Sequence, residues 1–482
     1  MKKQFNLKIV LLSLISITAL YSCSNLELEA TDSVIQDVTF TGLADTEESL
    51  NGLYSETWGM LGDQGNFFAL NEVTTDEQVV PTRGSDWGDN GQWSSLHDHK
   101  WKVDHNFLLP TWNQLNSKVL KATQIISPLS NASSQEIAEA KFLRAYAYFN
   151  LVRLYGGVPL VTTVVGSDEK ELLFTRVDEA IIYEQIVADL QEGVTYLDNT
   201  NKSRASKAAA QGILAKVYLT KPTRNYAGAK QLCEDIMNSG FSLESNFKNV
   251  FYNELNNEII FAVQYLSGNP DESQGFSSEF TSYKRQGRQD GLNIVNPNLA
   301  EDFIAFGGNR TSVSYAAFGD DADLPVPLDA EVIKFLPDGY DISDTNLPTY
   351  GGAPSLAGND WIILRYSDVL LMHAEAIMED GDTPNASAID SYMEVRVRAG
   401  FDAVSDRPSV LTKDALLLER RVELAFENHR FFDLLRLGVA HDVLGAHAAT
   451  MGYSSYNIRR LLLPIPSREI NLSDGILTQN PQ

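Results

Sequence analysis

The chain has 482 residues and carries 64 acidic against 38 basic side chains, which gives a formal net charge of −26. A negative surplus of this size argues against nucleic acid and against anionic membrane surfaces as partners. It suits a neutral or cationic ligand, and the length suffices for a large core in one big domain or two.

The first 23 residues have the pattern of a bacterial lipoprotein signal. Three lysines among the first eight residues lead into a nearly apolar run that ends at Tyr21, too short for a comfortable membrane span. Residues 20–23 (LYSC) resemble a lipobox, with small Ser22 before Cys23. We therefore predict a signal peptide over residues 1–22 and lipidation at Cys23, with an ordinary cleaved signal as the alternative. No other segment is apolar enough to cross a bilayer, so the lipid alone would anchor the mature protein.

Hydrophobic periodicity predicts a mainly α-helical chain. An extended leader over 24–40 precedes a helix that Asp45 caps, and residues 59–103 read as loops. The clearest helix is capped by Ser134 and ends at Gly156. The other predicted helices cover about 105–129, 177–197, 206–220, 225–239, 367–379, 386–399 and 412–437. Cys233 lies in one of them, so we expect a buried, inert thiol and no disulfide.

The helices come in pairs with tetratricopeptide-like spacing, clearest in NYAGAKQLCEDIMNSGFSL. From 240 to 361 the pattern breaks into short β-like runs such as EIIFAVQY and into long loops. We predict a single domain over 23–482, with a helical scaffold at about 41–240 and 362–482 and large loop-rich insertions at about 240–361. Function usually resides on such loops.

Four stretches, in this order along the chain, resemble the SusD/RagB family of outer-membrane lipoproteins of Bacteroidetes. They are AEAKFLRAYAYFNLVRLYGGVPLV (138–161), LRYSDVLLMHAEAI (364–377), ERRVELAFENHRFFDLLRLG (419–438) and LLPIPSREINLSDGILTQNP (462–481). One departure is the Leu-Ser-Asp-Gly that follows Asn471, where family members often have Asn-Pro.

The resemblance implies a non-catalytic surface protein with a SusD-like helical scaffold. Such proteins bind a glycan and lie as a hinged lid over a SusC-like, TonB-dependent transporter. It places the lipid-anchored chain on the outer leaflet, and we expect no cofactor and no metal. Glu27 and Glu29, just after Cys23, look like the family's acidic export tag.

Residues 82–93, TRGSDWGDNGQW, have the composition of a sugar-binding loop. Trp87 and Trp93 offer aromatic planes for the C–H face of a sugar, while Arg83 and Asp86 can bind its hydroxyls. Two alternatives stay open: the tryptophans could pack the loop against the core, and Arg83 could pair with Asp86. Tyr283, Arg285 and Arg288, in a second long loop, are weaker candidates for the same site, and Trp361 beside a core motif is interpreted as structural.

Other chemistry receives less support from the sequence. The HDH of 97–99 with His105 lacks further ligands at metal-binding spacing, and the acidic loops GDDADLP and DGYDISD do not fit an EF-hand. Glu423 and Glu427 have the spacing of a carboxylate pair one helical turn apart, but neighbouring arginines favour an ion-paired helix over a glycosidase centre. We therefore expect a surface glycan-binding protein, with a neutral glycan such as a β-glucan as the favoured ligand. A lid for a peptide or glycopeptide transporter and, less favoured, a glycoside hydrolase remain alternatives.

Overall fold

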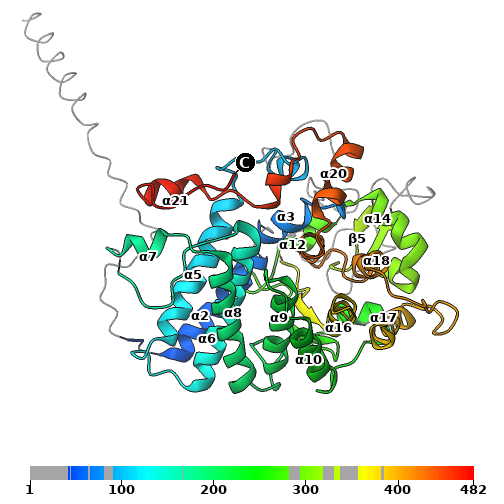
Figure 1. The fold of residues 1–482 in the computed structure, drawn as a ribbon, viewed down its shortest axis with the longest axis horizontal. Helices are drawn as coiled ribbons and strands as arrows, with labels where there is room; N and C mark the ends of the chain where they lie inside the picture. Colours follow the sequence, from blue (N-terminus) through cyan, green and yellow to red (C-terminus); the bar gives the residue numbers. More distant parts are fainter. Residues whose placement is uncertain are drawn as a thin grey trace, which may run out of the picture. The chain divides into compact units, whose positions relative to one another are not determined.

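The computed structural model describes residues 42–43, 45–62, 66–80, 91–166, 168–281, 294–317, 330–336, 356–381 and 385–481. Residues 40–165 and 169–482 belong to one compact unit. The predicted mainly α-helical fold is confirmed (Figure 1). The longer helices are α2 (Thr46–Gly62), α5 (Leu108–Ile126), α6 (Ser134–Tyr155), α8 (Glu179–Tyr196), α9 (Lys207–Thr220), α10 (Tyr226–Met237), α16 (Tyr366–Glu379), α17 (Ala386–Arg398), α18 (Lys413–Glu423) and α20 (Ala440–Met451). The shorter helices are α3 (Asn66–Glu72), α4 (Gln92–His97), α7 (Lys170–Phe174), α11 (Phe247–Tyr252), α12 (Phe276–Phe280), α14 (Pro297–Asp302), α15 (Thr311–Ser314), α19 (Arg430–Arg436) and α21 (Ser467–Leu472).

The scaffold is a row of helices in which each packs against the next. α5 packs on α6, and the row continues through α8, α9, α10, α16 and α17 (Figure 1). This arrangement confirms the predicted stacking of helix pairs. On α5, the apolar side chains of Trp112, Leu115, Val119 and Ile125 are buried. α6 is buried on more than one face, because α2, α5 and α8 all pack against it and small residues such as Ala145 and Ala147 allow close approach.

Helix ends follow the capping rules, with one correction. Asp45 accepts a hydrogen bond from the amide of Glu48 at 3.0 Å, as predicted. The cap of α6 is Ser133 and not Ser134. The Ser133 hydroxyl accepts from the amide of Glu136, while the Glu136 carboxylate accepts from the amide of Ser133. The predicted cap was wrong by one residue because this reciprocal box needs a Glu three positions after the cap, and only Ser133 has one.

The strands form three antiparallel pairs in the described part of the chain. β1 (Gln78–Val79) pairs with β3 (Ile294–Val295), β2 (Ile259–Val263) with β6 (Trp361–Arg365), and β4 (Tyr315–Ala317) with β5 (Ala330–Val332). The β-like run EIIFAVQY is thus confirmed as β2. The prediction of loops throughout 59–103 was wrong, because α2 extends to Gly62 and α3 and α4 are short helices within that range. Helices of six or seven residues are too short to show a sustained period.

The predicted helix over 412–437 is also two helices. α18 ends at Glu423 and α19 begins at Arg430, with Phe426 and Asn428 in the left-handed region at φ 67° and 65°. The ammonium of Lys334 donates to the carbonyl oxygens of Glu423 (3.1 Å) and Ala425 (3.0 Å). Buried donors from distant elements therefore take the carbonyls that a continuous helix would use, and local periodicity cannot reveal this.

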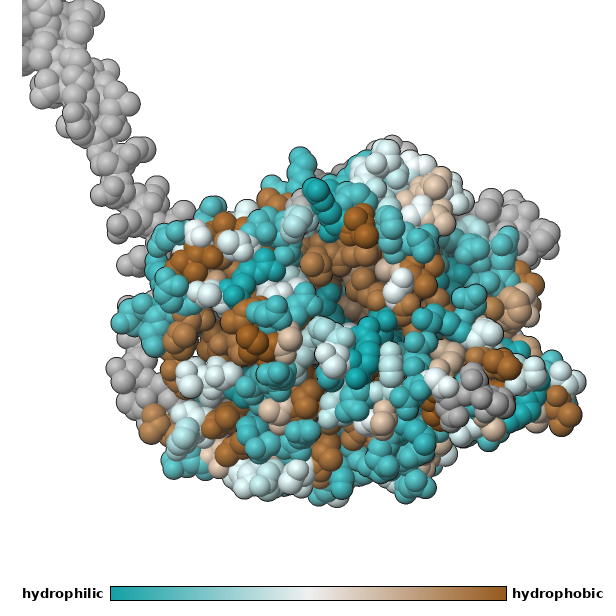
Figure 2. Space-filling model, viewed as in Figure 1, coloured by the Kyte–Doolittle hydropathy of each residue, from teal (hydrophilic) through white to brown (hydrophobic). Residues whose placement is uncertain are grey.

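Two structural predictions for single residues are confirmed. Trp361 is buried and stacks on Phe335, with Phe276 edge-on to it. Cys233 is a free, buried thiol whose pKa burial raises well above its usual value, so it stays protonated and unreactive. Among the described helices, none is both long and apolar enough to cross a membrane. Residues 1–22 and Cys23 lie outside the described residues. On the face seen in Figure 2, polar and apolar residues are interspersed, and apolar residues gather in a hollow near α3.

Candidate functional site

Both loops that the sequence analysis associates with ligand attach to the same two-stranded ladder. β1 leads into residues 81–90, and β3 directly follows residues 282–293. The strands are antiparallel, with Gln78 opposite Val295 and Val79 opposite Ile294. The first loop therefore begins, and the second loop ends, at the same end of this ladder.

The candidate residues within these loops lie outside the described residues. This holds for Arg83, Asp86 and Trp87 in the first loop, for Tyr283, Arg285 and Arg288 in the second, and for the acidic segments 319–325 and 338–344. Their roles stay predictions. The structure adds the common base of the two loops, which the sequence analysis did not identify.

The segment that leads into β1 is polar yet buried, and ion pairs hold it. Arg430 donates to both carboxylate oxygens of Asp76 at 2.8 Å, and Arg421 donates to the Asp76 carbonyl oxygen at 2.8 Å. Burial alone would raise the pKa of Asp76, but Arg421 and Arg430 hold it well below its usual range. The segment before β1, which leads into the first loop, is therefore held against α18 and α19 by ion pairs that stay charged.

The segment that follows β3 is held by the same arginine. The amide of Asn296 donates to the Glu77 carbonyl oxygen at 2.9 Å, and the Asn296 side chain accepts from the amide of Asn298 at the start of α14. Arg421 donates to the Asn298 side chain at 3.0 Å and also to Asp302. Arg421 thus links the segment before β1 to the segment after β3. These hydrogen bonds fix the position of the two segments relative to each other.

Trp93 lies at the start of α4, two residues after Gly91, whose φ of 75° gives the left-handed turn into this helix. Its side chain is 4% exposed, and its ring meets Phe107 edge-on at 5.8 Å between centroids. This placement corresponds to the packing role that was the alternative to ligand contact. Stacking of Trp93 on a sugar stays a prediction and would require the ring to leave this position.

The histidines after Trp93 form an aromatic cluster with the α20 region. The His97 ring lies 5.0 Å from Tyr453 and 5.9 Å from His447, and the His99 ring lies 5.0 Å from Tyr456. Burial lowers the pKa of His97 to about 4 and that of His99 to about 3, so both are neutral at pH 7. Among the described residues, no three His, Cys, Asp or Glu side chains form a group that could hold a metal ion.

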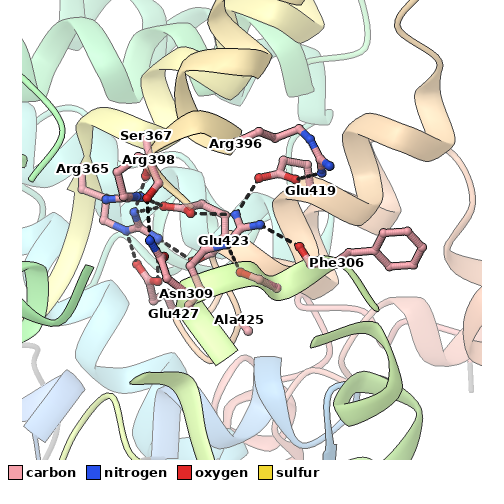
Figure 3. Close-up of polar contacts among 12 residues, drawn as sticks. Phe306, Asn309, Arg365, Ser367, Arg396, Arg398, Glu419, Glu423, Ala425 and Glu427 are labelled. Carbon is pink, nitrogen blue, oxygen red and sulfur yellow. Dashed lines mark hydrogen bonds and ion pairs between the residues drawn. The ribbon is translucent and has the colours of Figure 1, made fainter. Parts of the chain in front are cut away.

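Glu423 and Glu427 are components of a buried ion-pair network (Figure 3). Glu423 contacts Arg310, Arg365 and Arg398, and Glu427 contacts Arg365 and Lys334. Burial would raise the pKa of Glu423, but these arginines hold it well below its usual range. A glycosidase acid needs the opposite shift, so the pair is structural, as the sequence analysis favoured.

The partners in this network differ from those that sequence proximity suggested. Arg420 pairs with Asp368 and Asp433, and Arg436 pairs with Glu375. The arginines that meet Glu423 come instead from β6, α17 and the segment after α14. A signal was present for Arg365, which is a charged residue inside the apolar run WIILRYSDVLL. A charge at such a position is found mostly where a buried partner exists.

Two family models match the chain. A model described as the SusD family matches residues 341–482, and one described as starch-binding proteins associating with the outer membrane matches residues 28–219. SusD-like protein P2 of Formosa agariphila is 26% identical over 97% of this chain and 98% of its own length. SusD-like protein P25 of the same organism is 27% identical over 95% of each chain.

The chain belongs to the SusD-like family. Solved structures with the same fold include a laminarin-binding SusD-like protein, with a TM-score of 0.75 and 22% identity over 92% of this chain and 99% of that one. Surface glycan-binding protein A of Bacteroides thetaiotaomicron, in complex with laminarihexaose, has a TM-score of 0.72 and 20% identity over 90% and 98% of the two chains. The SusD-like fold therefore extends over nearly the whole chain.

Proposed function

We propose that this SusD-like protein binds a glycan at the cell surface, with the two predicted loops, residues 81–90 and 282–293, forming the binding site. The observation that carries the proposal is the common origin of these loops at one end of the ladder, with Arg421 bonded to the segments on both sides. In a ligand-binding protein, loops on a rigid base supply the contacts while the base keeps them in register. Trp87 supplies the stacking plane, and Arg83 and Asp86 bind hydroxyl groups.

The ligand that fits best is a neutral glycan such as a β-glucan. The formal charge of −26 disfavours a polyanion, and the first loop offers an aromatic plane with few cations. Two similar structures support this class by their names, one a laminarin-binding protein and one solved with laminarihexaose. A third was solved with a xylogluco-oligosaccharide. We propose delivery to a SusC-like, TonB-dependent transporter, and anchoring to the outer leaflet through lipidated Cys23.

We propose further that the protein does not cleave its ligand. The carboxylate pair that the sequence offers, Glu423 and Glu427, is buried and held ionised by arginines and a lysine, and so cannot donate a proton to a glycosidic oxygen. Binding without chemistry is also the role that the family resemblance implies.

The test is calorimetry of the soluble fragment 24–482 against a panel of neutral and acidic polysaccharides. Binding of a neutral β-glucan without release of shorter products is the expected result. Trp87→Ala should lose about 1 kcal/mol or more of binding free energy, which is the value of one stacking plane. Tyr196→Ala, which removes an exposed aromatic ring from α8, is the matched control and should bind as the wild type does.

Other outcomes have distinct meanings. Binding of peptides or glycopeptides, with no glycan bound, would move the ligand class to that of a peptide transporter lid. Unchanged glycan binding by Trp87→Ala would place the site away from the first loop. Release of shorter saccharides by the purified fragment would establish a glycoside hydrolase and overturn the non-catalytic assignment.

A further inference from the structure

A small, partly open pocket lies between α3, α6, α9, β6 and the turn before α19. Its volume is about 40 Å³. This is far below the ~300–1,000 Å³ of sites for organic ligands, yet it exceeds the ~10–15 Å³ that one water molecule needs. Phenyl rings of Phe67, Phe149 and Phe432 form one part of the wall. The polar part of the wall includes Asn150, Arg153, Lys216, Asn428 and His429.

Arg153 is held in this wall by two aromatic rings. Its guanidinium carbon lies 3.9 Å from the ring centre of Phe149 and 3.6 Å from that of Phe432. Nε donates to the Phe149 carbonyl oxygen at 3.2 Å, and Nη2 donates to the Asn150 side-chain oxygen at 2.6 Å. In the described part of the chain, Arg153 makes no ion pair with a carboxylate. Burial lowers its pKa to about 10, which still leaves it charged at pH 7.

The neighbouring carboxylates are already shared among other cations. Lys216 contacts Asp368 at 2.7 Å, and the same carboxylate accepts from Arg420 at 2.9 Å. Arg420 also pairs with Asp433, which Arg436 contacts in turn.

The other carboxylates near Arg153 are also paired with other cations. Arg436 takes Glu375, and Glu427, which lines the pocket, is held by Arg365 and Lys334. Asp433, whose negative charge acts on Arg153, is thus already paired with Arg420 and Arg436, so Arg153 has no carboxylate of its own, and a poorly solvated charge without one is unfavourable.

We propose that this pocket binds a small monovalent anion of halide size, with Arg153 and Lys216 supplying the positive charge. The remaining polar groups can serve the same ligand. Burial lowers the pKa of His429 to about 3, so its ring is neutral and can donate one N–H. The Asn428 amide, whose oxygen is buried without a partner among the described residues, can turn its NH₂ group toward an anion.

The size of the pocket selects the ligand. A sugar ring does not fit in about 40 Å³, so this site is separate from the proposed glycan site and does not depend on it. An anion here would join α6, α9 and the turn before α19 at one point. Because the anion would bind the folded chain and not the unfolded chain, it would stabilise the folded chain by mass action.

The first test is thermal unfolding of the full mature chain at constant ionic strength, with chloride progressively replacing gluconate. We expect a saturable rise of the melting temperature with chloride and with bromide. Arg153→Gln should abolish the chloride-dependent part of this rise. The matched control is Arg407→Gln, which removes an arginine from an exposed pair with Asp390 and should keep the chloride dependence.

Two results would overturn the proposal. One is the same melting temperature in chloride and gluconate at every concentration. The other is a rise with glucuronate and none with chloride, which would place the charge on a carboxylate of a larger ligand.

A second measurement needs no variant and remains decisive if Arg153→Gln does not fold. Wild-type crystals soaked in bromide should show an anomalous difference peak beside Arg153 and Lys216. Peaks confined to the outer surface, with none in this pocket, would contradict the assignment.

Discussion

At the scale of single residues, the buried charges of this protein are fixed in place by their partners. Glu423 is surrounded by Arg310, Arg365 and Arg398, and all four side chains are almost completely buried. Desolvation of such groups is unfavourable, and it is offset only while each charge has its counterpart. The network therefore holds together β6, α17, α18 and the segment that follows α14.

Replacing Glu423 by Gln should destabilise the protein by about 3–5 kcal/mol, because it leaves several buried arginines with too few carboxylates. The measurement is the free energy of unfolding from urea denaturation. The matched control is Asp390→Asn, which breaks the exposed pair with Arg407, where the side chains are 65% and 36% exposed. That change should cost under about 1 kcal/mol. Equal losses of unfolding free energy in Glu423→Gln and Asp390→Asn would show that the buried network does not hold these elements together.

Trp93 allows the packing and stacking interpretations to be separated. With a 4% exposed ring against Phe107, Trp93→Ala should cost about 3–5 kcal/mol of unfolding free energy, as for other large buried rings. Urea denaturation measures this cost, and calorimetry with the bound glycan measures any separate loss of affinity. A variant of wild-type stability with reduced affinity would instead support direct contact between Trp93 and a sugar.

At the scale of helices and strands, the cap of α6 provides the sharpest test. Ser133 and Ser134 are adjacent and chemically identical, but only Ser133 makes the reciprocal bonds with Glu136. Ser133→Ala should cost about 1 kcal/mol, while Ser134→Ala should cost much less. Thermal or urea unfolding of the two variants measures the difference. A larger cost at Ser134 would place the helix start one residue later.

The helices could be predicted from the sequence because their signals are local. Period, caps and breakers lie within a few residues, and α5, α8, α9, α10, α16 and α17 were all placed from them. The turn between α18 and α19 could not be predicted, because its carbonyls bond to Lys334 and Arg365, which are remote in sequence. The local sequence pattern therefore predicts the helices, but contacts with residues remote in sequence determine where a helix such as 412–437 is interrupted.

The candidate site was only partly predictable for the same reason. The composition of residues 82–93 is visible in the sequence, and so is the length of the second loop. Their common base rests on a ladder of two residues in each strand, Gln78–Val79 and Ile294–Val295, which is too short to show alternation. The arginines that hold this base against the scaffold, Arg421 and Arg430, lie near Glu423 and Glu427 in sequence, and that proximity does not reveal their bonds to Asp76.

At the scale of the whole molecule, buried titratable groups make the free energy of unfolding depend on pH in two opposite ways. The pKa of His97 is lowered to about 4 and that of His99 to about 3, so the unfolded chain binds more protons than the folded chain between these values and about 6.5. Stability should therefore fall as the pH decreases through this range. Glu77 has the opposite effect, because burial raises its pKa to about 7.

The folded chain binds the Glu77 proton more tightly than the unfolded chain does, so stability from this group is present at low pH and is lost as the pH rises from about 4.5 to about 7. Glu77→Gln, which cannot ionise, should flatten the decline toward pH 7, and His97→Gln should flatten the decline toward acid pH. Urea unfolding at pH 4 to 8 measures both slopes, with His441→Gln, at an exposed position of α20, as the control. An unchanged slope in Glu77→Gln would mean that this carboxyl is already ionised in the folded protein. The segment leading into β1 would then carry a second buried negative charge beside Asp76, which Arg421 and Arg430 would have to balance.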